Sequence, residues 1–235
     1  MVQRGQISSP GRICLFGEHQ DYLGLPIIPA AINKRLNLYY HLENSPTILE
    51  LSSKQLNQTE MLRLKQAPKL TGSPFDYQKA VLQHFWNEMT SPLPSKIVID
   101  CDIPIRSGLS SSAALLTTMV FLIKHIALNC KSPLEEIAEI AYHCEHDLMG
   151  ISCGRMDQYA CSIGRVFHMT STESPKVTPL NLSNDVYLII GDSQIERKAD
   201  IPLKTVQQDI FQALHLLGSP NLNSLSEKTI MNSFI

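Results

Sequence analysis

Five side chains able to form hydrogen bonds lie within eleven positions near the amino terminus, in the segment SSPGRICLFGEHQDYLG at residues 8–24. They flank an apolar run at residues 13–16 that predicts a buried strand. So many donors and acceptors around one strand end indicate a candidate binding site. The set consists of Arg12, Glu18, His19, Asp21 and Tyr22.

A second candidate site lies in IPIRSGLSSSAAL, residues 103–115, where a predicted strand, a Gly/Ser turn and a helix beginning near Leu109 follow one another. The unpaired amides and the dipole of such a helix N-terminus favour an anion, above all phosphate. The hydroxyls of Ser110, Ser111 and Ser112 can add to this cradle or reach a metal. The other interpretation is a serine-rich helix cap without a ligand. The segment is not a Walker loop, because it lacks the Gly-Lys-Ser/Thr ending.

A third candidate is Glu145, a carboxylate on the apolar face of the next predicted helix. Its position is unfavourable unless the carboxylate is paired, and Mg²⁺ with nucleotide phosphates is a frequent partner of such a group. His143 and His146 lie close by, but two residues are too few for a transition-metal site, and solvated helix histidines explain them as well. The apolar stripe that Glu145 shares consists of Leu134, Ile137, Ala138, Ala141 and Leu148.

This helix is expected to begin at Pro133, after a cap at Ser132, and to run to about Met149. Ser132 can cap it, Pro133 can occupy the first helical position, and Glu135 can complete a capping box.

The fourth candidate is Asp157 in CGRMDQYACSIG, residues 153–164, between a Gly154 turn and a short helical pattern. A simple interpretation is an acid favoured by the dipole at a helix start. A base for a sugar or alcohol hydroxyl needs a carboxylate held near a positive group, and Arg12 is the candidate partner.

The elements that must position these residues are strands and helices in mixed order. The sequence predicts strands at residues 95–104, in GRVFHM and in DVYLIIGD, and helices at about 109–128, 133–149 and 202–216. A further helix is predicted in FDYQKAVLQHFWNEM. This mixture lacks a strict strand, helix, strand repetition and therefore indicates a layered α+β fold. The predicted core face of that further helix is Phe75, Val81, Leu82, Phe85 and Met89.

The composition of the chain indicates which classes of binding partner to expect. The chain has 235 residues and a net charge of −2, so neither nucleic acid nor an anionic membrane is expected as a partner, and a small neutral or weakly charged ligand is favoured. The polar start and the interrupted apolar stretches predict a cytoplasmic protein without a membrane span. The six cysteines form no Cys-x-x-Cys pair, which indicates reduced core thiols.

Three segments together resemble the GHMP kinase superfamily, and within it the galactokinases. PGRICLFGEHQDYLG is similar to the galactokinase signature, residues 104–113 match the second GHMP motif, and residues 153–158 match the Cys-Gly-x-Met-Asp-Gln segment. IIGDSQIERK, residues 189–198, is a fainter match. Mevalonate-like and homoserine-like kinases share the second motif but not Glu-His-x-Asp-Tyr.

The resemblance implies ATP-dependent phosphorylation of a monosaccharide hydroxyl, the anomeric one in galactokinases. It implies that Asp157 and Arg12 flank this hydroxyl and that Ser112 and Glu145 hold Mg²⁺ on ATP. The implied sugar-binding residues are Glu18, His19, Asp21 and Tyr22. The implied ATP-binding residues are Arg106, Ser107, Gly108, Leu109, Ser110, Ser111 and Ser112.

The chain also departs from the family pattern. Arg106 and Ser107 stand where the second motif usually has glycines, Gln20 and Leu23 alter the front signature, and Arg155 replaces an apolar residue. We expect residues 1–198 to form the GHMP amino-terminal domain and residues 199–235 to be the start of a truncated carboxy-terminal domain. The alternative function is a catalytically inactive sugar- or nucleotide-binding regulator, or a nonfunctional fragment of a GHMP kinase.

Overall fold

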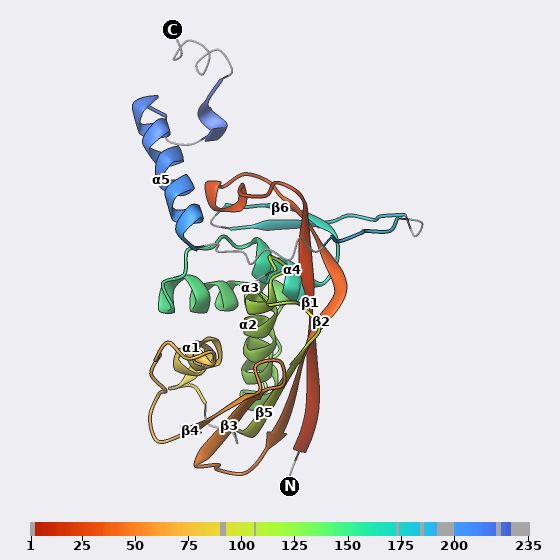
Figure 1. Cartoon of the computed structure of the whole chain (residues 1–235), viewed down its shortest axis with the longest axis vertical. Helices are drawn as coiled ribbons and strands as arrows, with labels where there is room; N and C mark the ends of the chain where they lie inside the picture. Colours follow the sequence, from red (N-terminus) through yellow and green to blue (C-terminus); the bar gives the residue numbers. More distant parts are fainter. Residues whose placement is uncertain are drawn as a thin grey trace.

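The computed structural model describes residues 3–89, 93–105, 107–172, 174–183, 186–191, 200–219 and 222–226. Its main feature is a five-stranded mixed sheet in the order β1-β2-β5-β3-β4 (Figure 1). All neighbouring pairs are antiparallel except β3 and β5, which run parallel. The strands are β1 (Gln3–Phe16), β2 (Ile28–Leu42), β3 (Ile48–Ser53), β4 (Gln58–Arg63) and β5 (Pro94–Cys101).

A second, two-stranded sheet pairs β6 (Phe167–Thr170) with β7 (Lys176–Pro179). Isolated bridges from Ile27 to Met169 and from Ala30 to Val166 attach it to the beginning of β2. The turn between β1 and β2, which carries the front signature, therefore lies beside this small sheet (Figure 1).

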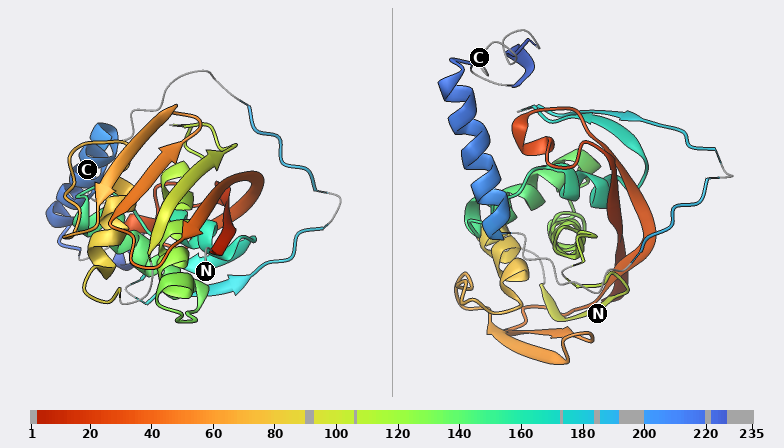
Figure 2. Two further views of the ribbon diagram at one scale, coloured as in Figure 1. Left: turned by 90° about the horizontal axis from the view of Figure 1, so that it is seen from below. Right: turned by 45° about the horizontal axis from the view of Figure 1, so that its top comes forward.

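The helices cover one face of the large sheet. The first is α1 (Asp76–Phe85), and α2 (Ser111–Phe121) continues as a π-helical segment, Leu122–Ala127. Similarly, α3 (Leu134–His143) continues as the π-helical segment Cys144–Leu148, and α4 (Met156–Ile163) follows. Figure 2 shows α2 end-on near the middle of the molecule, between the long strands and the other helices. This position explains its apolar sequence, because partners cover it on nearly every side.

The last described elements are α5 (Asp200–Leu216) and a short 3₁₀ turn, Leu222–Ser224. The predicted helix at residues 202–216 is thus confirmed. The expected domain boundary at residue 198 stays a prediction. Within the described residues, we find no helix with the length and apolar character needed to cross a membrane.

Most predicted elements are confirmed, including the α+β class, the strand at residues 95–104 and the helix with its core face of Phe75, Val81, Leu82 and Phe85. Met89 is partly buried and packs against the same core. The strand predicted in DVYLIIGD is wrong for its described part, because residues 186–191 form no strand and are exposed. An extended apolar segment becomes a strand only when its backbone groups find a partner strand, and none pairs with these residues in the part of the chain described.

The apolar run at residues 13–16 lies in β1 as predicted, but it is not buried. Phe16 is 69% exposed. The reason is its place in the sheet: β1 is an edge strand, and its register with β2 shifts between Cys14 and Phe16. The alternation of one covered and one open face is interrupted at such an irregularity.

Two details of the helix carrying Glu145 also differ from the prediction. The helix begins at Leu134 with Pro133 as its N-cap and without a side-chain cap, so the predicted Ser132 cap with Glu135 is wrong. Instead, Ser132 hydrogen-bonds Glu136. Leu134 and Leu148, which were predicted on the buried stripe, are exposed. The π-helical turn explains Leu148, because bonds from i to i+5 rotate later residues away from the face that a 3.6-residue period predicts.

Candidate functional site

Arg12 is the buried cation around which the site is built. It lies on β1, only 5% exposed. Its Nη2 lies 2.6 Å from Asp157 Oδ1, and its Nε donates to the same oxygen at 2.8 Å. Burial by itself lowers the pKa of Arg12, but the charge and hydrogen bond of Asp157 raise it overall, so the guanidinium stays charged. The predicted pairing of Arg12 with Asp157 is therefore present, across 145 positions of sequence.

The Gly/Ser turn also contacts Arg12, through its backbone carbonyl groups. Arg12 Nη1 donates to the Gly108 carbonyl at 2.6 Å, and the Arg12 backbone amide donates to the Leu109 carbonyl at 3.2 Å. Gly108 adopts φ 76°, which an L residue rarely tolerates. This conformation lets the turn direct its carbonyl groups to β1, and it ties the start of α2 to the strand that carries Arg12.

Asp157 is the second residue of α4, and its other oxygen is also held. Ser110 donates its hydroxyl to Asp157 Oδ2 at 2.7 Å. Ser110 is the N-cap residue of α2, so the helix begins two residues later than Leu109. The carboxylate thus contacts a residue of β1 and a residue at the beginning of α2.

Ser9 fixes the relative position of these three elements. Its hydroxyl donates to the Cys161 carbonyl on α4 at 2.8 Å and lies 3.2 Å from Thr117 Oγ1 on α2. All three residues are buried. A buried hydroxyl with two polar partners is well satisfied, and it holds β1, α2 and α4 in register beneath Arg12 and Asp157.

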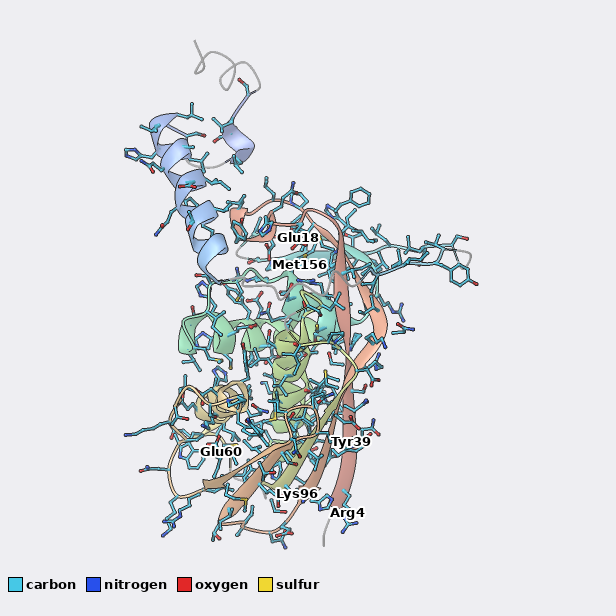
Figure 3. All side chains as sticks on the ribbon, in the orientation of Figure 1. Arg4, Glu18, Tyr39, Glu60, Lys96 and Met156 are labelled. Carbon is cyan, nitrogen blue, oxygen red and sulfur yellow. The ribbon has the colours of Figure 1, made fainter. Side chains whose placement is uncertain are left out.

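Asp21 lies on the turn after β1 and reaches the beginning of α4. Its Oδ2 accepts the Met156 amide at 3.3 Å. Burial, together with the negative charge of Asp157, raises the pKa of Asp21. The approach is possible because residue 154 is a glycine: a Cβ there would overlap the Asp21 carboxylate. Figure 3 shows the neighbourhood, with Glu18 on the turn above Met156.

The other residues predicted to bind sugar lie on the same turn. Glu18 and His19 are exposed, and His19 has the left-handed φ of 63°. The His19 ring lies edge-on to Tyr22, with centroids 6.1 Å apart. Burial, then the charges of Asp21 and Glu18, raise the pKa of Tyr22, and the buried Tyr22 hydroxyl has no hydrogen-bond partner among the described groups. Such an orphaned hydroxyl fits a site that a polar ligand completes.

The N-terminus of α2 has the features of an anion site. Ser110 forms no side-chain cap, so its hydroxyl leaves the first-turn amides of the helix without that partner. Ser111 and Ser112 are the first two helical residues and are partly buried. Ser107 donates its hydroxyl to the Pro104 carbonyl at 2.7 Å, and Arg106 lies outside the described residues.

Glu145 is buried as predicted, with 5% exposure, on the π-helical turn after α3. Gln158 Nε2 donates to its Oε2 at 2.6 Å. The same amide has a buried oxygen, Oε1, without a partner among the described groups. Burial, followed by the charges of Glu145, Asp157 and Asp21, raises the pKa of Cys153.

A divalent cation fits the donors present. The Glu145 carboxylate, the Ser112 hydroxyl and the orphaned Gln158 amide oxygen are hard oxygen donors, the kind that Mg²⁺ prefers. Across the described chain, no cluster of three or more His, Cys, Asp or Glu side chains could hold a metal ion by itself. An ion held with the help of nucleotide phosphates does not need such a cluster.

Arg155, which departs from the family pattern, has partners on α3. Arg155 Nε lies 3.0 Å from Glu139 Oε1, and its guanidinium stacks over the Tyr142 ring at 4.3 Å. Tyr159 donates to the same Glu139 oxygen at 2.8 Å. The side chain therefore ties the beginning of α4 to α3.

Sequence reasoning missed three contributors to the site: the bond from Ser110 to Asp157, the need for glycine at 154, and Gln158 as the partner of Glu145. Gln158 follows Asp157 directly, and Gly154 was noted only as a turn. No local pattern pairs these residues with groups more than ten positions away.

Comparison with known proteins is consistent with this geometry. Residues 76–165 match the GHMP kinases N terminal domain, and residues 2–40 match the galactokinase galactose-binding signature. Over these two segments the chain is therefore similar to the GHMP kinase superfamily. Within it, the front signature and the curated relatives make it similar to galactokinases.

The galactokinase of Thermosipho africanus is 28% identical over 230 residues, which cover 96% of this chain and 63% of the relative. The galactokinase of Thermotoga maritima is 32% identical over 88% of this chain and 61% of the relative. This chain thus spans a little over three fifths of the length of these curated relatives.

Solved structures show the same fold. The galactokinase of Lactococcus lactis, complexed with galactose, superposes with a TM-score of 0.75 at 22% identity, covering 96% of this chain and 61% of that one. A D-glycero-D-manno-heptose 1-phosphate kinase from Bacteriodes thetaiotaomicron gives a TM-score of 0.66 at 23% identity, covering 78% and 61% of the two chains.

Proposed function

We propose that this chain forms the sugar- and ATP-binding part of a sugar kinase, which transfers the γ-phosphoryl group of ATP to the anomeric hydroxyl of a galactose-type monosaccharide. The observation that carries the proposal is the Arg12–Asp157 pair beside the N-terminus of α2. A carboxylate positioned by a cation suits activation of a hydroxyl, and helix amides suit phosphate.

The sugar is bound, in this proposal, by Glu18, His19, Asp21 and Tyr22. Two findings support it: the orphaned Tyr22 hydroxyl and the galactose-binding signature over residues 2–40. The relatives named galactokinase favour a hexose of the galactose type. Recognition by several oriented donors and acceptors is what distinguishes one sugar hydroxyl pattern from another.

ATP is bound through its phosphates at residues 106–112, with the first-turn amides of α2 as donors. Ser112 and Glu145 would hold Mg²⁺, which would neutralise charge on the phosphate oxygens. Gln158 keeps the Glu145 carboxylate oriented through its 2.6 Å hydrogen bond. The proposed metal ligands, Ser112 and Glu145, both offer oxygen atoms, which Mg²⁺ prefers.

In the transfer step, the sugar oxygen bonds to the γ-phosphorus while the bond from that phosphorus to the bridging oxygen of ADP breaks. The hydroxyl proton passes to Asp157. Arg12 pairs with Asp157 and holds the carboxylate in place through Oδ1. Catalysis of this kind depends mainly on positioning and on charge stabilisation.

The decisive experiment combines binding and turnover on this chain. Galactose and MgATP binding are measured by calorimetry, and ADP release is measured by a coupled assay with galactose and other hexoses. We expect Asp157→Asn to bind MgATP within about twofold of wild type and to lower kcat by about 100- to 10,000-fold. Asparagine can still accept a hydrogen bond from Arg12, and circular dichroism checks that the variant folds.

Turnover unchanged in Asp157→Asn would remove Asp157 from the chemistry. Binding of both ligands without ADP release by the wild-type chain would contradict phosphoryl transfer by this chain and favour a binding-only role.

A further inference from the structure

Ser110 occupies an unusual position for a serine. It is the N-cap of α2, yet its backbone is left-handed, with φ 63° and ψ 44°. Residues with a Cβ rarely adopt this conformation, whereas glycine adopts it freely. The side chain is also buried, with 7% exposure. A strained, buried serine at a helix start indicates that the hydroxyl has a specific partner.

That partner is not the helix. A serine N-cap normally accepts a hydrogen bond from an amide of the first turn, and Ser110 makes no such bond. Its hydroxyl donates instead to Asp157 Oδ2 at 2.7 Å. The backbone carbonyl of Ser110 accepts the Ala114 amide at 3.0 Å, so the residue still begins the helix.

The consequence is that each oxygen of Asp157 has its own donor. Arg12 on β1 holds Oδ1, and Ser110 at the start of α2 holds Oδ2. Two donors on separate elements restrict rotation of the Asp157 carboxylate about its Cβ–Cγ bond. A single donor would leave that rotation much freer, because the carboxylate torsion is soft.

We propose that Ser110 is a positioning residue for Asp157, which fixes the orientation of its carboxylate toward the acceptor hydroxyl, and that its hydroxyl is not a phosphate ligand. The proposal rests on the assignment of Asp157 as the group that accepts the hydroxyl proton. It assigns to Ser110, the first of three consecutive serines, a role different from that of Ser112.

The test compares Ser110→Ala with Ser110→Gly in the full chain. Both variants remove the hydroxyl, but only glycine relieves the left-handed backbone. We expect kcat to fall by about 10- to 100-fold in both, with the dissociation constant of MgATP within about twofold of wild type. The glycine variant should melt at a higher temperature than the alanine variant, so loss of activity and loss of stability are separated.

Ser162→Ala is the matched control, because Ser162 lies on the same helix as Asp157 and donates its hydroxyl to the Leu134 carbonyl at 2.7 Å. It removes one hydroxyl hydrogen bond from α4 without touching the site. We expect its kcat to equal that of wild type.

A second measurement does not depend on turnover. In the wild-type chain and the two Ser110 variants, the ¹³Cγ resonance of Asp157 is compared at one fixed pH. We expect this resonance to shift in both variants and to stay in place in Ser162→Ala. If the wild-type chain releases no ADP, the proposed function fails, and this resonance still decides the inference.

Either of two results would overturn the inference. One is weaker MgATP binding in both Ser110 variants with kcat preserved, which would make the hydroxyl a phosphate ligand. The other is an unchanged Asp157 resonance in both variants.

Discussion

At the scale of single residues, the site brings two carboxylates and one cation together. Asp157 is paired with Arg12, whereas Asp21 is only partly buried, and burial together with the charge of Asp157 raises its pKa. A carboxylate with a raised pKa is less stable in its ionised form, so the ionised Asp21 lowers the stability of the folded protein. Such a cost is typical of residues that act on a ligand.

Gly154 is the residue that allows Asp21 to reach the beginning of α4. In Gly154→Ala, the new Cβ overlaps the Asp21 carboxylate and displaces it from the Met156 amide. We expect galactose affinity to fall by about tenfold or more, and the free energy of unfolding to drop by about 1–3 kcal/mol. Calorimetry with galactose and urea unfolding measure the two effects.

Gly191→Ala is the control, because a Cβ at residue 191 meets no atom of the described residues within 4 Å. We expect this variant to change neither the galactose affinity nor the free energy of unfolding. Equal galactose binding in Gly154→Ala and wild type would show that the position of Asp21 does not matter for the sugar.

At the scale of elements, a buried lysine joins β4 to the beginning of α1. Lys79 is 1% exposed, and its ammonium lies 2.8 Å from Glu60 Oε1 and 3.0 Å from Asp76 Oδ1. It also donates to the hydroxyls of Thr71 and Ser73, at 2.8 and 2.9 Å. Glu60 marks this corner of the molecule in Figure 3. The network satisfies the ammonium fully, as a buried charge requires.

Lys79→Met keeps the length of the side chain but removes the charge. The carboxylates of Asp76 and Glu60 then lose their shared cation, and Asp76 remains nearly buried. We expect the free energy of unfolding to fall by about 3 kcal/mol, measured by urea denaturation.

Lys96→Met is the comparison, because Lys96 forms an ion pair with Glu50 on the surface at 2.8 Å. Loss of this ion pair should lower the free energy of unfolding by less than about 1 kcal/mol. Similar losses in the two variants would mean that the Lys79 network contributes no more than a surface pair.

At the scale of the whole molecule, burial is unequal along the chain. The helix α2 lies in the core between the sheet and the other helices, and most of its central residues are buried (Figure 2). The described side chains of α5 are mostly exposed, including Phe211 and Leu216, with Leu214 as a buried exception. Elements with little buried surface open at low free energy.

Amide hydrogen exchange should therefore differ between these two helices. We expect the amides of α2 to exchange at least about 100-fold more slowly than those of α5, because α2 opens only with the core. Mass spectrometry of peptides from each helix measures the rates. Protection of α5 equal to that of α2 would contradict this distribution of stability.

Much of the fold was predictable because local patterns carry it. The apolar length of α2, the alternation in β5 and the core face of α1 depend on neighbouring residues, and all three are confirmed. Burial of Glu145 was predictable too, because a regular helix places it four residues after Ala141. The exposed Leu148 was not, because the π-helical turn depends on the packing of the helix end.

By itself, the sequence determined which chemical groups are present and which elements carry them: Arg12 on a strand near the amino terminus, a serine-rich helix start, and Asp157 at the beginning of a short helix. Only the tertiary structure decided which groups meet. In the structure, the Ser110 hydroxyl donates to Asp157 and not to the helix, and Arg155 pairs with Glu139. The strand β1 lies at the edge of the large sheet. The physical reason is that hydrogen bonds between distant segments depend on how whole elements pack, and local spacing carries no record of that packing.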